Sequence, residues 1–533
     1  MKKIALADSD YKDPEKLRAF IKSAGDRLSA SARLNLQGII ENLEGRRDAA
    51  LDRFERSSSL KGADFAPFLN FAKLAITIPD FQRAAPFATK AWDLSPKKTA
   101  EVALPLIACL LDKGRSAEAL KIISKLPLAE SRIRDIWFSK VSALRQERET
   151  EVALKEVSAI EATFGIDENT IRLRGDLYGH DNSLEASRLY LEALQRSELK
   201  GKINHVLRWN ASLHLLRTRQ YERGWEYYDS GLTPAVGTMG RSLHELFKKL
   251  DRISHTDRNK LDASKWTIAT VEQGIGDQVL FLSSYSEFLT EFPKTILLTE
   301  PRMLPILRRS FPGAVFASPG LLESLVKGVL PNNGYLPIGT IFGWYRQRVE
   351  CFFARRKPFL VIDRNRYQKL RDMLKEKAKG RPVVGISWKG GYWESQKRNK
   401  TITLSDWLPI LQKDALIVNL QYGDISDDIR EAKPLSDDMV FFPKLNFKED
   451  LDDWMTIAAA CDGIISISTA LVHFAGASGQ KVAVLMPETQ GPWILGTEDS
   501  VHPVYPHVHI FRRSMDESLG ELLNRVAKIV VTN

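Results

Sequence analysis

The chain has 533 residues, of which 44% are hydrophobic and 27% are charged, a composition typical of globular proteins. A chain of this length exceeds what one hydrophobic core normally supports, so two or more domains are expected. Its net charge of +10 favours anionic partners such as nucleotide diphosphates, but lysines and arginines occur throughout both halves, so no dedicated nucleic-acid surface is indicated. Three widely separated cysteines without CxxC spacing argue against a disulfide framework or a zinc site, and we expect no bound metal.

The N-terminus and the apolar runs along the chain predict where the protein is found. Residues 1–16 begin with Met-Lys-Lys but contain no apolar run of the length of a signal peptide. No later stretch reaches the roughly 20 apolar residues of a membrane span. We therefore expect a cytoplasmic protein with no transmembrane segment.

The first half of the chain has apolar residues at helical spacing and an internal period. Two small residues twelve positions apart let the two helices of a hairpin pack closely, as in tetratricopeptide (TPR) repeats. We expect about six such hairpins in an α-solenoid whose open face recognises an extended peptide or a partner domain. A scaffold that only stabilises the second half or mediates dimerisation is the alternative. The small residues that mark the units are Gly38 and Ala50, Ala72 and Ala84, Ala119, and Ser212 and Gly224.

After residue 250 the pattern changes to short β-type runs that alternate with helices. Such alternation predicts parallel sheets built from right-handed βαβ units, and the basic region around 346–380 separates two groups of strands. We expect two Rossmann-like lobes that face a cleft, with ligands beyond the carboxyl ends of the strands. The predicted strands are 266–271, 295–299, 314–317, 383–388, 416–421, 463–467 and 481–486.

The first candidate site is the turn at 271–278, where a β run stops at Gly274 and Gly276 and a helix begins. The glycines permit close backbone approach, and Asp277 then lies at the mouth of the sheet, where its carboxylate can take a proton from an acceptor hydroxyl. Capping of the helix N-terminus is the alternative role of Asp277, and position alone does not separate the two.

The second candidate site is the glycine-rich turn after strand 383–388, which the basic segment 397–400 follows. Mobile glycines with cations nearby can surround a diphosphate and stabilise the charge on a leaving nucleotide. Lys389 and Arg398 are the candidate cations. A surface loop with solvated charges is the alternative.

The third candidate site follows strand 463–467. Ser468 and Thr469 lie in the first turn of the next helix, where hydroxyls and free backbone N–H groups can hold a phosphate together with the helix dipole. His473 lies one turn further along the same face. A single histidine on a helix is more often structural than catalytic, so the three residues are informative together.

Five segments carry a resemblance to a known family: 221–228 (YERGWEYY), 272–277 (EQGIGD), 385–389 (GISWK), 419–424 (NLQYGD) and 468–479 (STALVHFAGASG). In this order they resemble bacterial TPR-containing glycosyltransferases related to the heptosyltransferase-like GT-B group. The resemblance implies metal-independent transfer, with a nucleotide sugar as co-substrate and no cofactor. It also implies a fold in the α + α/β class: a TPR-like α-solenoid over 1–250 and a GT-B module of two Rossmann-like lobes, the acceptor lobe at 264–365 and the nucleotide-sugar lobe at 380–533.

Carried over residue by residue, the resemblance implies that Asp277 is the base that deprotonates the acceptor. It places Gln421 and Tyr422 by the nucleobase or ribose and Trp493 by the donor sugar. This chain departs from many relatives in having Ser468 where they have Asp. The implied donor-binding residues are Ser387, Trp388, Lys389, Arg398, Gln421, Tyr422, Ser468, Thr469, His473 and Trp493.

The turn 387–391 (SWKGG) and the segment 421–424 (QYGD) look closer to the flagellin-modifying relatives, which transfer a nonulosonic acid from a CMP-activated donor. We therefore predict O-glycosylation of a Ser or Thr hydroxyl, with flagellin as the expected protein acceptor on the TPR-like domain and no nucleic-acid partner. Two alternatives stay open. One is a heptosyltransferase-like enzyme of glycan or lipopolysaccharide assembly with ADP-heptose-like donors, and the other is an inactive GT-B adaptor or chaperone that acts through its TPR domain.

Overall fold

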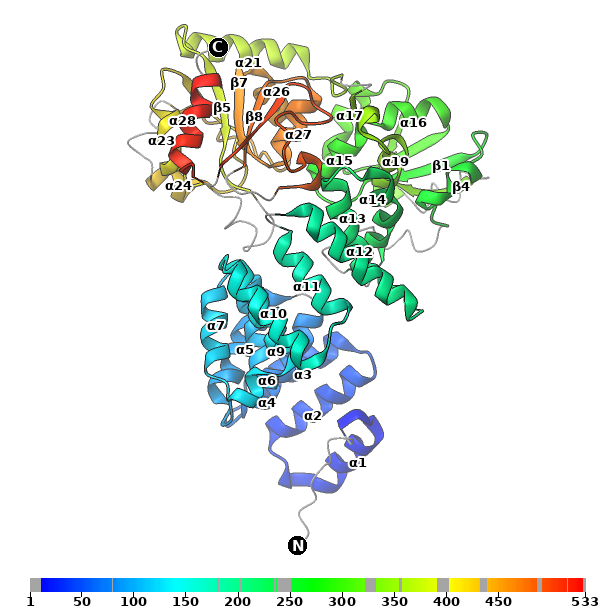
Figure 1. The fold of residues 1–533 in the computed structure, drawn as a ribbon, viewed down its shortest axis with the longest axis vertical. Helices are drawn as coiled ribbons and strands as arrows, with labels where there is room; N and C mark the ends of the chain where they lie inside the picture. Colours follow the sequence, from blue (N-terminus) through cyan, green and yellow to red (C-terminus); the bar gives the residue numbers. More distant parts are fainter. Residues whose placement is uncertain are drawn as a thin grey trace. The chain divides into compact units, whose positions relative to one another are not determined.

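The computed structural model describes residues 11–530, except 79, 180–181, 202, 234–235, 237–250, 322–331, 354–356, 391–401, 432–438, 487–490 and 515. The chain divides into two compact units, one that ends at Ile166 and one that begins at Asp167. The first unit is helical, and the second contains two β-sheets with the helices that cover them (Figure 1). None of the described helices combines the length and the apolar character that crossing a bilayer requires.

Helices α2 to α14 pair into six hairpins within the described part of the chain, as the repeat period predicts. A Cβ atom on Gly38 would lie 2.6 Å from the ring of Phe54, and one on Gly224 would lie 2.6 Å from the Leu216 side chain. The predicted small positions are therefore the places where paired helices touch. After α1 (Pro14–Ala24), the hairpins are α2–α3 (Ala30–Leu43, Arg47–Ser58), α4–α5 (Phe65–Thr77, Phe81–Leu94), α6–α7 (Ala100–Asp112, Ser116–Ser124), α9–α10 (Arg134–Gln146, Thr150–Phe164), α11–α12 (Glu168–Tyr178, Ser183–Leu199) and α13–α14 (His205–Arg217, Tyr221–Tyr228).

Polar residues at the breaks between helices explain where the hairpins begin and turn. The Asp64 carboxylate accepts a hydrogen bond from the Ala66 N–H at the start of α4, and the Asn204 side chain accepts one from the Leu207 N–H at the start of α13, at 3.0 and 3.1 Å. These side chains satisfy backbone donors that have no partner inside the helix. Gly45, with φ of 81°, makes the left-handed turn between α2 and α3.

The second unit contains two sheets whose described strands all pair in parallel, with the orders β3-β2-β1-β4 and β6-β5-β7-β8-β9. All seven predicted strands are present, and the expectation of two Rossmann-like lobes is confirmed. The strands are β1 (Trp266–Thr270), β2 (Thr295–Leu298), β3 (Val315–Ala317), β4 (Asn332–Pro337), β5 (Val383–Ser387), β6 (Leu416–Asn419), β7 (Gly463–Ile467), β8 (Val482–Met486) and β9 (Val508–Arg512).

The sequence pattern did not predict two edge strands, β4 and β9. In β4, Gly334 has a φ of 104°, and a Cβ atom there would lie 2.3 Å from the Asp251 carbonyl oxygen. The pairing of β4 with β1 also shifts register between Trp266 and Ile268. Because β4 contains a glycine and a bulge, it lacks the regular apolar pattern that identifies strands, and the sequence pattern does not predict it.

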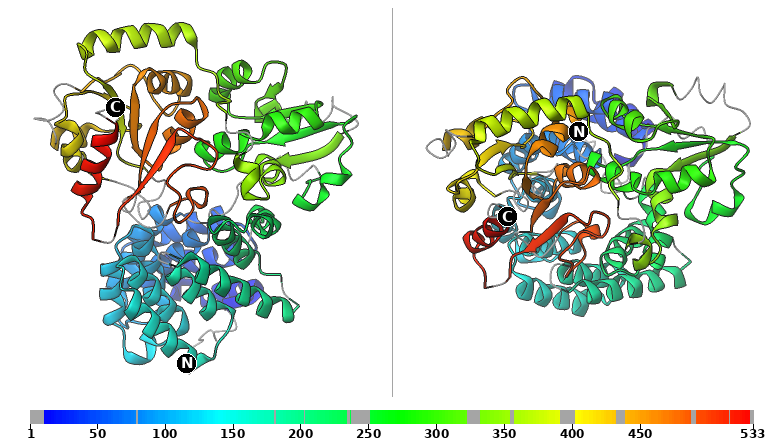
Figure 2. Two further views of the ribbon diagram at one scale, coloured as in Figure 1. Left: turned by 45° about the horizontal axis from the view of Figure 1, so that its top comes forward. Right: turned by 90° about the horizontal axis from the view of Figure 1, so that it is seen from above.

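Helices cover both faces of the second sheet (Figure 2). Successive residues of β5 show why: Val383 packs in the core that contains α21, α26 and α27, and Val384 packs in the core that contains α23 and α28. Alternate side chains of a strand point to opposite faces, so an unbroken apolar run is buried on both sides. The described α-helices of the two lobes are α15 (Ile275–Leu282), α16 (Tyr285–Glu291), α17 (Leu304–Ser310), α19 (Ile338–Tyr345), α20 (Val349–Phe353), α21 (Arg364–Ala378), α23 (Leu408–Leu411), α24 (Ser426–Glu431), α26 (Leu451–Ala460), α27 (Ala470–Ala477) and α28 (Leu519–Val530).

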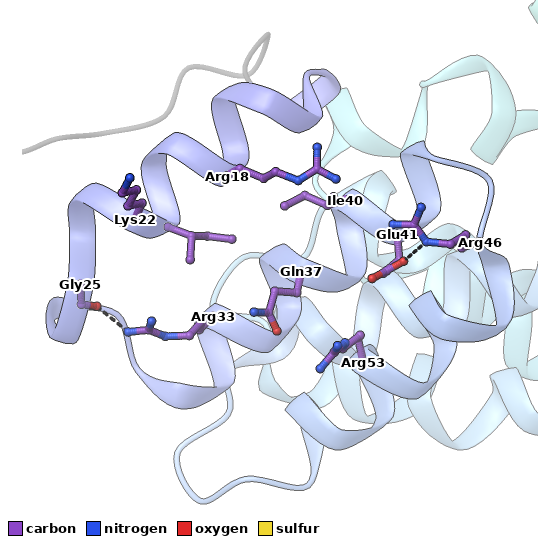
Figure 3. A pocket seen from close by; sticks show the side chains of 10 residues that line it. Arg18, Lys22, Gly25, Arg33, Gln37, Ile40, Glu41, Arg46 and Arg53 are labelled. Atoms are coloured by element: carbon purple, nitrogen blue, oxygen red, sulfur yellow. Dashed lines mark hydrogen bonds and ion pairs between the residues drawn. The ribbon is translucent and has the colours of Figure 1, made fainter.

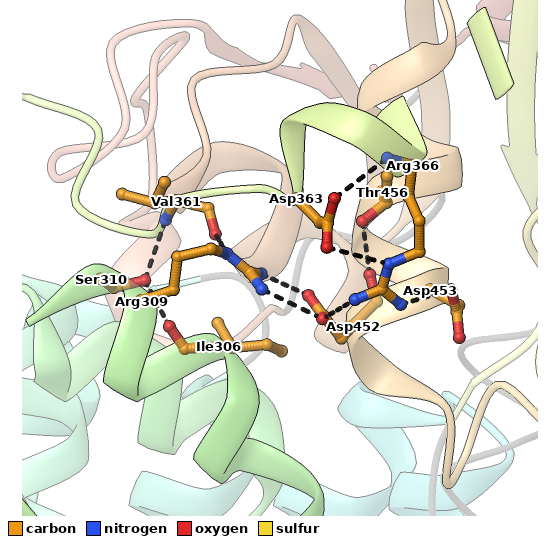
Figure 4. A network of polar contacts seen from close by, with 9 residues as sticks. All are labelled: Ile306, Arg309, Ser310, Val361, Asp363, Arg366, Asp452, Asp453 and Thr456. Carbon is orange, nitrogen blue, oxygen red and sulfur yellow. Dashed lines mark hydrogen bonds and ion pairs between the residues drawn. The ribbon is translucent and has the colours of Figure 1, made fainter. Parts of the chain in front are cut away.

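An ion-pair network joins the two lobes (Figure 4). Asp452 of α26 accepts hydrogen bonds from Arg309 of α17 and from Arg366 of α21, and Arg366 also donates to Asp453 at 2.7 Å. The Asp452 side chain is 10% exposed, and both guanidinium groups are less exposed than a free surface arginine. Such charge-assisted, multidentate bonds are stronger than ordinary surface pairs.

We expect Asp452→Ala to lower the free energy of unfolding of the second unit by about 1–2 kcal/mol, because two guanidinium groups lose a shared, nearly buried acceptor. Urea unfolding of the full chain measures the change. Asp427→Ala is the matched control, since Asp427 forms an exposed pair with Arg430 at 3.0 Å on α24. That variant should unfold within about 0.5 kcal/mol of the parent protein, and equal effects of the two substitutions would contradict the structural role of Asp452.

Candidate functional site

A pocket of about 870 Å³ lies between the two lobes, where strands of both sheets end. In each sheet the strand order reverses beside a central strand, between β1 and β4 in one and between β5 and β7 in the other. Ligands of open parallel sheets bind outside the carboxyl ends of strands at such a reversal. The turn after β1 lines the pocket from the first lobe, and the turns after β5, β6 and β7 line it from the second.

The two lobes meet at the starts of α15 and α27. A Cβ atom on Gly276 would lie 3.0 Å from Cδ2 of His473 and 3.2 Å from Cα of Ala470. A larger residue at position 276 would therefore push the helices apart. A glycine is therefore needed at position 276 for the close contact of the two helices as well as for the turn. This contact brings two of the predicted sites, the glycine turn and the helix after Ser468, close together.

Asp277 lies in the first turn of α15 and lines the pocket, half-buried. Its Oδ2 atom lies 3.3 Å from the position that a Cβ on Gly274 would take, so the carboxylate lies over the glycine turn. Burial raises the pKa of Tyr505 well above the usual value, and the nearby charge of Asp277 adds to the effect, since a phenolate there would face a second negative charge. The structure therefore places the predicted carboxylate at the pocket.

Glu272 and Gln273, the two residues before Gly274, fix the turn; no individual role was predicted for either of them. Glu272 is buried, and its Oε1 atom accepts a hydrogen bond of 2.7 Å from the Gly339 N–H at the start of α19. Gln273 has a φ of 60°, in the left-handed region that non-glycine residues rarely adopt. Its Nε2 donates to the Tyr228 hydroxyl at 2.7 Å. The EQGIGD segment is thus anchored on both sides before Asp277.

Gln421 lines the pocket and the hollow beside it, and its side chain also holds the neighbouring turn. Its side chain is 2% exposed, and its Oε1 accepts hydrogen bonds from the Ser387 hydroxyl at 3.0 Å and from the N–H groups of Trp388 and Lys389 at 2.9 Å. Its Nε2 donates to the Tyr422 carbonyl at 3.0 Å. Gln421 therefore lies at the pocket wall as a clamp that holds the turn after β5.

The other predicted residues of that turn divide between pocket and core. Ser387 and Trp388 are fully buried, and Trp388 packs in the core on the α23 and α28 side of the sheet, so neither side chain lines the pocket. Lys389 lines the pocket, and its ammonium donates to Asp428 and to the Asp424 carbonyl, at 2.5 and 2.6 Å. Arg398 lies outside the described residues.

The remaining predicted residues all line the pocket. Thr469 caps the start of α27, and its hydroxyl lies 3.3 Å from that of Ser466. Trp493 is 8% exposed and packs edge-on against Trp225 of α14, with ring centroids 5.3 Å apart. The predicted residues that line the pocket are Asp277, Lys389, Gln421, Tyr422, Ser468, Thr469, His473 and Trp493.

Two cations of the pocket were not predicted because no motif surrounds them: Arg302 lies in a short 3-10 helix (Pro301–Met303) and Lys448 in a turn. Arg302 comes from the first lobe and donates to the carbonyl of Lys448 in the second. The Lys448 ammonium lies 5.9 Å from the centroid of the Tyr422 ring and has no ion-pair partner among the residues that the structure describes. A hollow of about 620 Å³ adjoins the pocket here, and its aromatic lining is Tyr422, Phe441, Phe442 and Phe447.

His473 lies beneath the pocket in contact with other rings. Its Nδ1 and the Tyr505 hydroxyl are 3.4 Å apart, and the His502 ring lies edge-on to it at 5.9 Å. Desolvation in these surroundings lowers the pKa of His473 from 6.5 to about 4. The imidazole is therefore neutral at pH 7, available to hydrogen-bond a ligand without adding a charge.

This pKa predicts a pH dependence of stability. Between pH 6.5 and about 4 the unfolded chain binds a proton at His473 that the folded protein does not bind. The free energy of unfolding should therefore fall as the pH is lowered through that range. Urea unfolding at a series of pH values measures the slope, and His473→Asn should make it shallower. Identical slopes for the variant and the parent protein would show that His473 does not carry the effect.

Hollows also occur among the described residues of the first unit. One, of about 520 Å³, lies among α1, α2 and α3 (Figure 3). Arg46 on its rim pairs with Glu41, and Arg33 donates to the Gly25 carbonyl at 2.7 Å, so part of its positive charge has local partners. Another, of about 1120 Å³, is a groove along α2 and α4, the first helices of successive hairpins. Asn70 Nδ2 donates to Asn35 Oδ1 at 2.9 Å in this groove.

The chain is similar over part of its length to known proteins. No family model matches the chain. It is 27% identical over 356 residues to Protein FlbA of Caulobacter vibrioides, across 62% of this chain and 55% of that protein, so the chain spans about half the length of that relative. Among solved structures, it is similar to a tetratricopeptide repeat protein from Parabacteroides merdae, at 14% identity and a TM-score of 0.35, over 40% of this chain and 83% of that one. It is also similar to the E. coli ADP-heptose lps heptosyltransferase II, at 12% identity and a TM-score of 0.35, over 50% of this chain and 99% of that one. The helical hairpins and the two parallel-sheet lobes that the resemblance implies are present in the described structure.

Proposed function

We propose that this protein is a glycosyltransferase that moves a sugar from a nucleotide-activated donor to a hydroxyl of a protein acceptor. The observation that supports it is the meeting of two strand-order reversals at one pocket. A carboxylate, Asp277, lies on one side, and the hydroxyls of Ser468 and Thr469 lie on the other with the start of α27. This is the arrangement that an acceptor base and a donor phosphate require.

In the proposed reaction the acceptor oxygen forms a bond to the anomeric carbon of the sugar. The bond from that carbon to the donor phosphate oxygen breaks, and its electron pair leaves with the phosphate. The acceptor proton passes to the carboxylate of Asp277. Arg302 and Lys448, which line the pocket, offset the negative charge of the departing nucleotide together with the backbone N–H groups that begin α27.

The aromatic hollow beside the pocket suggests where the nucleobase binds. Tyr422, Phe447 and Lys448 line both spaces, so a nucleotide can extend from one into the other. A base stacks on aromatic faces, whereas its phosphates need cations and N–H donors. We place the base in the hollow and the phosphate beside Ser468. In this arrangement Gln421 contributes to nucleotide binding by holding the turn after β5 in place.

For the acceptor we propose the groove along α2 and α4 of the first unit. Paired asparagine side chains at Asn35 and Asn70 can exchange hydrogen bonds with the backbone of an extended segment, and apolar residues such as Leu36 and Leu69 form its floor. A helical repeat array offers this kind of extended surface. Flagellin is the acceptor we propose, and a CMP-activated nonulosonic acid is the proposed donor.

The experiment incubates the purified full chain with flagellin and CMP-pseudaminic or CMP-legionaminic acid, and records the intact mass of flagellin. A mass increase of one nonulosonic acid unit supports the proposal in full. An increase only with an ADP-heptose donor on a glycan acceptor supports the heptosyltransferase-like alternative. No transfer to either acceptor from any CMP, UDP or ADP donor refutes the enzymatic proposal. The proposed chemistry uses no metal, so EDTA should leave the rate unchanged.

A further inference from the structure

The last helical hairpin, α13–α14, is built into the module that holds the pocket. The Trp225 indole is 1% exposed, and its Nε1 donates to the Arg346 carbonyl of the first lobe at 2.7 Å. Its ring meets that of Phe342 in α19 at 5.7 Å and that of Trp493 in the second lobe at 5.3 Å. One continuous apolar core therefore runs from this hairpin into both lobes.

Tyr228, the last residue of α14, reaches from this core to the turn before Asp277. Its side chain is 1% exposed and lies among the rings of Trp209, Trp225 and Phe281. Packing on three sides fixes the direction of its ring. The hydroxyl accepts the hydrogen bond of 2.7 Å from Gln273 Nε2. A residue of the helical repeats thus contacts the segment that carries the proposed base.

Gln273 needs such a contact because of its backbone. Left-handed conformations of non-glycine residues cost free energy and persist where the surroundings hold them in place. Here the residue before it is held by the Glu272 contact with Gly339, and Gln273 itself is held by Tyr228. The backbone direction set at Gln273 continues through Gly274 into the first turn of α15, which carries Asp277.

We propose that Tyr228 is a positioning residue: its hydrogen bond to Gln273 fixes the turn that aims Asp277 into the pocket. The inference rests on the proposed function of Asp277 and adds a dependence of that function on the last helical repeat. The last hairpin of the TPR-like array then helps to set the geometry of the active site. The packed structure that carries this effect lies within the second unit, which begins at Asp167.

Two single variants and their combination test the hydrogen bond. Tyr228→Phe removes the acceptor oxygen and keeps the ring. Gln273→Asn keeps a residue type that tolerates the left-handed region but is one methylene too short to reach Tyr228. Each should lower kcat by about 10- to 100-fold, the effect of a displaced catalytic group, with the KM for the donor unchanged. The double variant should fall no further than either single one, because both remove the same bond.

Tyr227→Phe is the matched control, since Tyr227 neighbours Tyr228 on α14 but packs beside Arg208 and against the hydrophobic cluster of α11, α12 and α13. It should leave kcat at the wild-type value. A loss that is equal for Tyr227→Phe and Tyr228→Phe would overturn the proposal, as would additive effects of Tyr228→Phe and Gln273→Asn or a change confined to KM.

Amide hydrogen exchange supplies a readout that does not depend on activity. Faster exchange at 271–278 is expected in both Tyr228→Phe and Gln273→Asn, and unchanged exchange at the turn would overturn the proposal. If the wild-type protein transfers no sugar to any acceptor while exchange at the turn responds as expected, the proposed function is wrong but the coupling between the hairpin and the turn stands.

Discussion

Asp277→Asn should lower the rate of sugar transfer by about 10²- to 10⁴-fold, the usual contribution of a positioned general base. The amide keeps the size and the hydrogen-bonding reach of the carboxylate, but it does not accept the acceptor proton. Asp277 lines the pocket opposite the start of α27 and does not contact the proposed nucleobase hollow. The affinity for nucleotide should therefore stay at the wild-type value, and the loss should appear in kcat.

Single-turnover transfer, followed by intact mass, and nucleotide titration by calorimetry measure the two quantities. Asp414→Asn is a suitable control because Asp414 is exposed on the loop before β6 of the second lobe. If Asp277→Asn retains full activity, Asp277 serves only to stabilise the helix start, which was the alternative at the sequence level. If it loses nucleotide binding as well as activity, the carboxylate acts on the donor side and the proposed division of the pocket is wrong.

Much of the fold follows from local patterns in the sequence. Small residues twelve positions apart predict the hairpins because a Cβ at Gly38 would run into Phe54, and this steric limit acts between neighbouring helices. Most of the seven predicted strands are short runs rich in apolar residues, because residues on both of their faces are buried; β5, β7 and β8 are buried along their whole length. The two missed strands lie at sheet edges, and one of them depends on the glycine at position 334 and on a register shift.

The site was harder to predict because position along a strand does not reveal the direction of a side chain. Trp388 was predicted as the last residue of its strand and lies one residue after β5; its ring packs in the core, whereas the next residue, Lys389, lines the pocket. Gln421 lines the pocket as predicted, but the hydrogen bonds by which its amide oxygen holds the neighbouring turn were not predicted. Such assignments depend on tertiary contacts between segments that lie more than 30 residues apart.

The contact between Tyr228 and Gln273 could not be predicted for the same reason. Both residues lie in segments that the sequence analysis singled out, but 45 positions separate them. The signal that a sequence offers is indirect: Gln273 precedes two closely spaced glycines, at a place where the chain must turn sharply. Its left-handed backbone and its partner become visible only when the hairpin and the lobe are packed together.

Gln421→Ala should disrupt the turn after β5 and lower the free energy of unfolding of the second unit by about 2–4 kcal/mol. One amide oxygen serves the Ser387 hydroxyl and the N–H groups of Trp388 and Lys389, and the first two of these residues are fully buried. Each buried donor left without an acceptor costs about 1–3 kcal/mol, less where water can enter the space. Urea unfolding measures this loss.

The same substitution should weaken nucleotide binding at least about tenfold, the equivalent of 1.4 kcal/mol, because Lys389 and the adjoining glycine would no longer be held at the pocket wall. The titration uses whichever of CMP, UDP or ADP the wild-type protein binds. Gln421→Glu keeps an oxygen for the three donors and should bind nucleotide better than the alanine variant. Gln412→Ala, on the exposed end of α23, should change neither property. If Gln421→Ala keeps wild-type stability and nucleotide affinity, the turn holds its shape without Gln421. The pocket wall would then be kept in place by β5 and β7 alone.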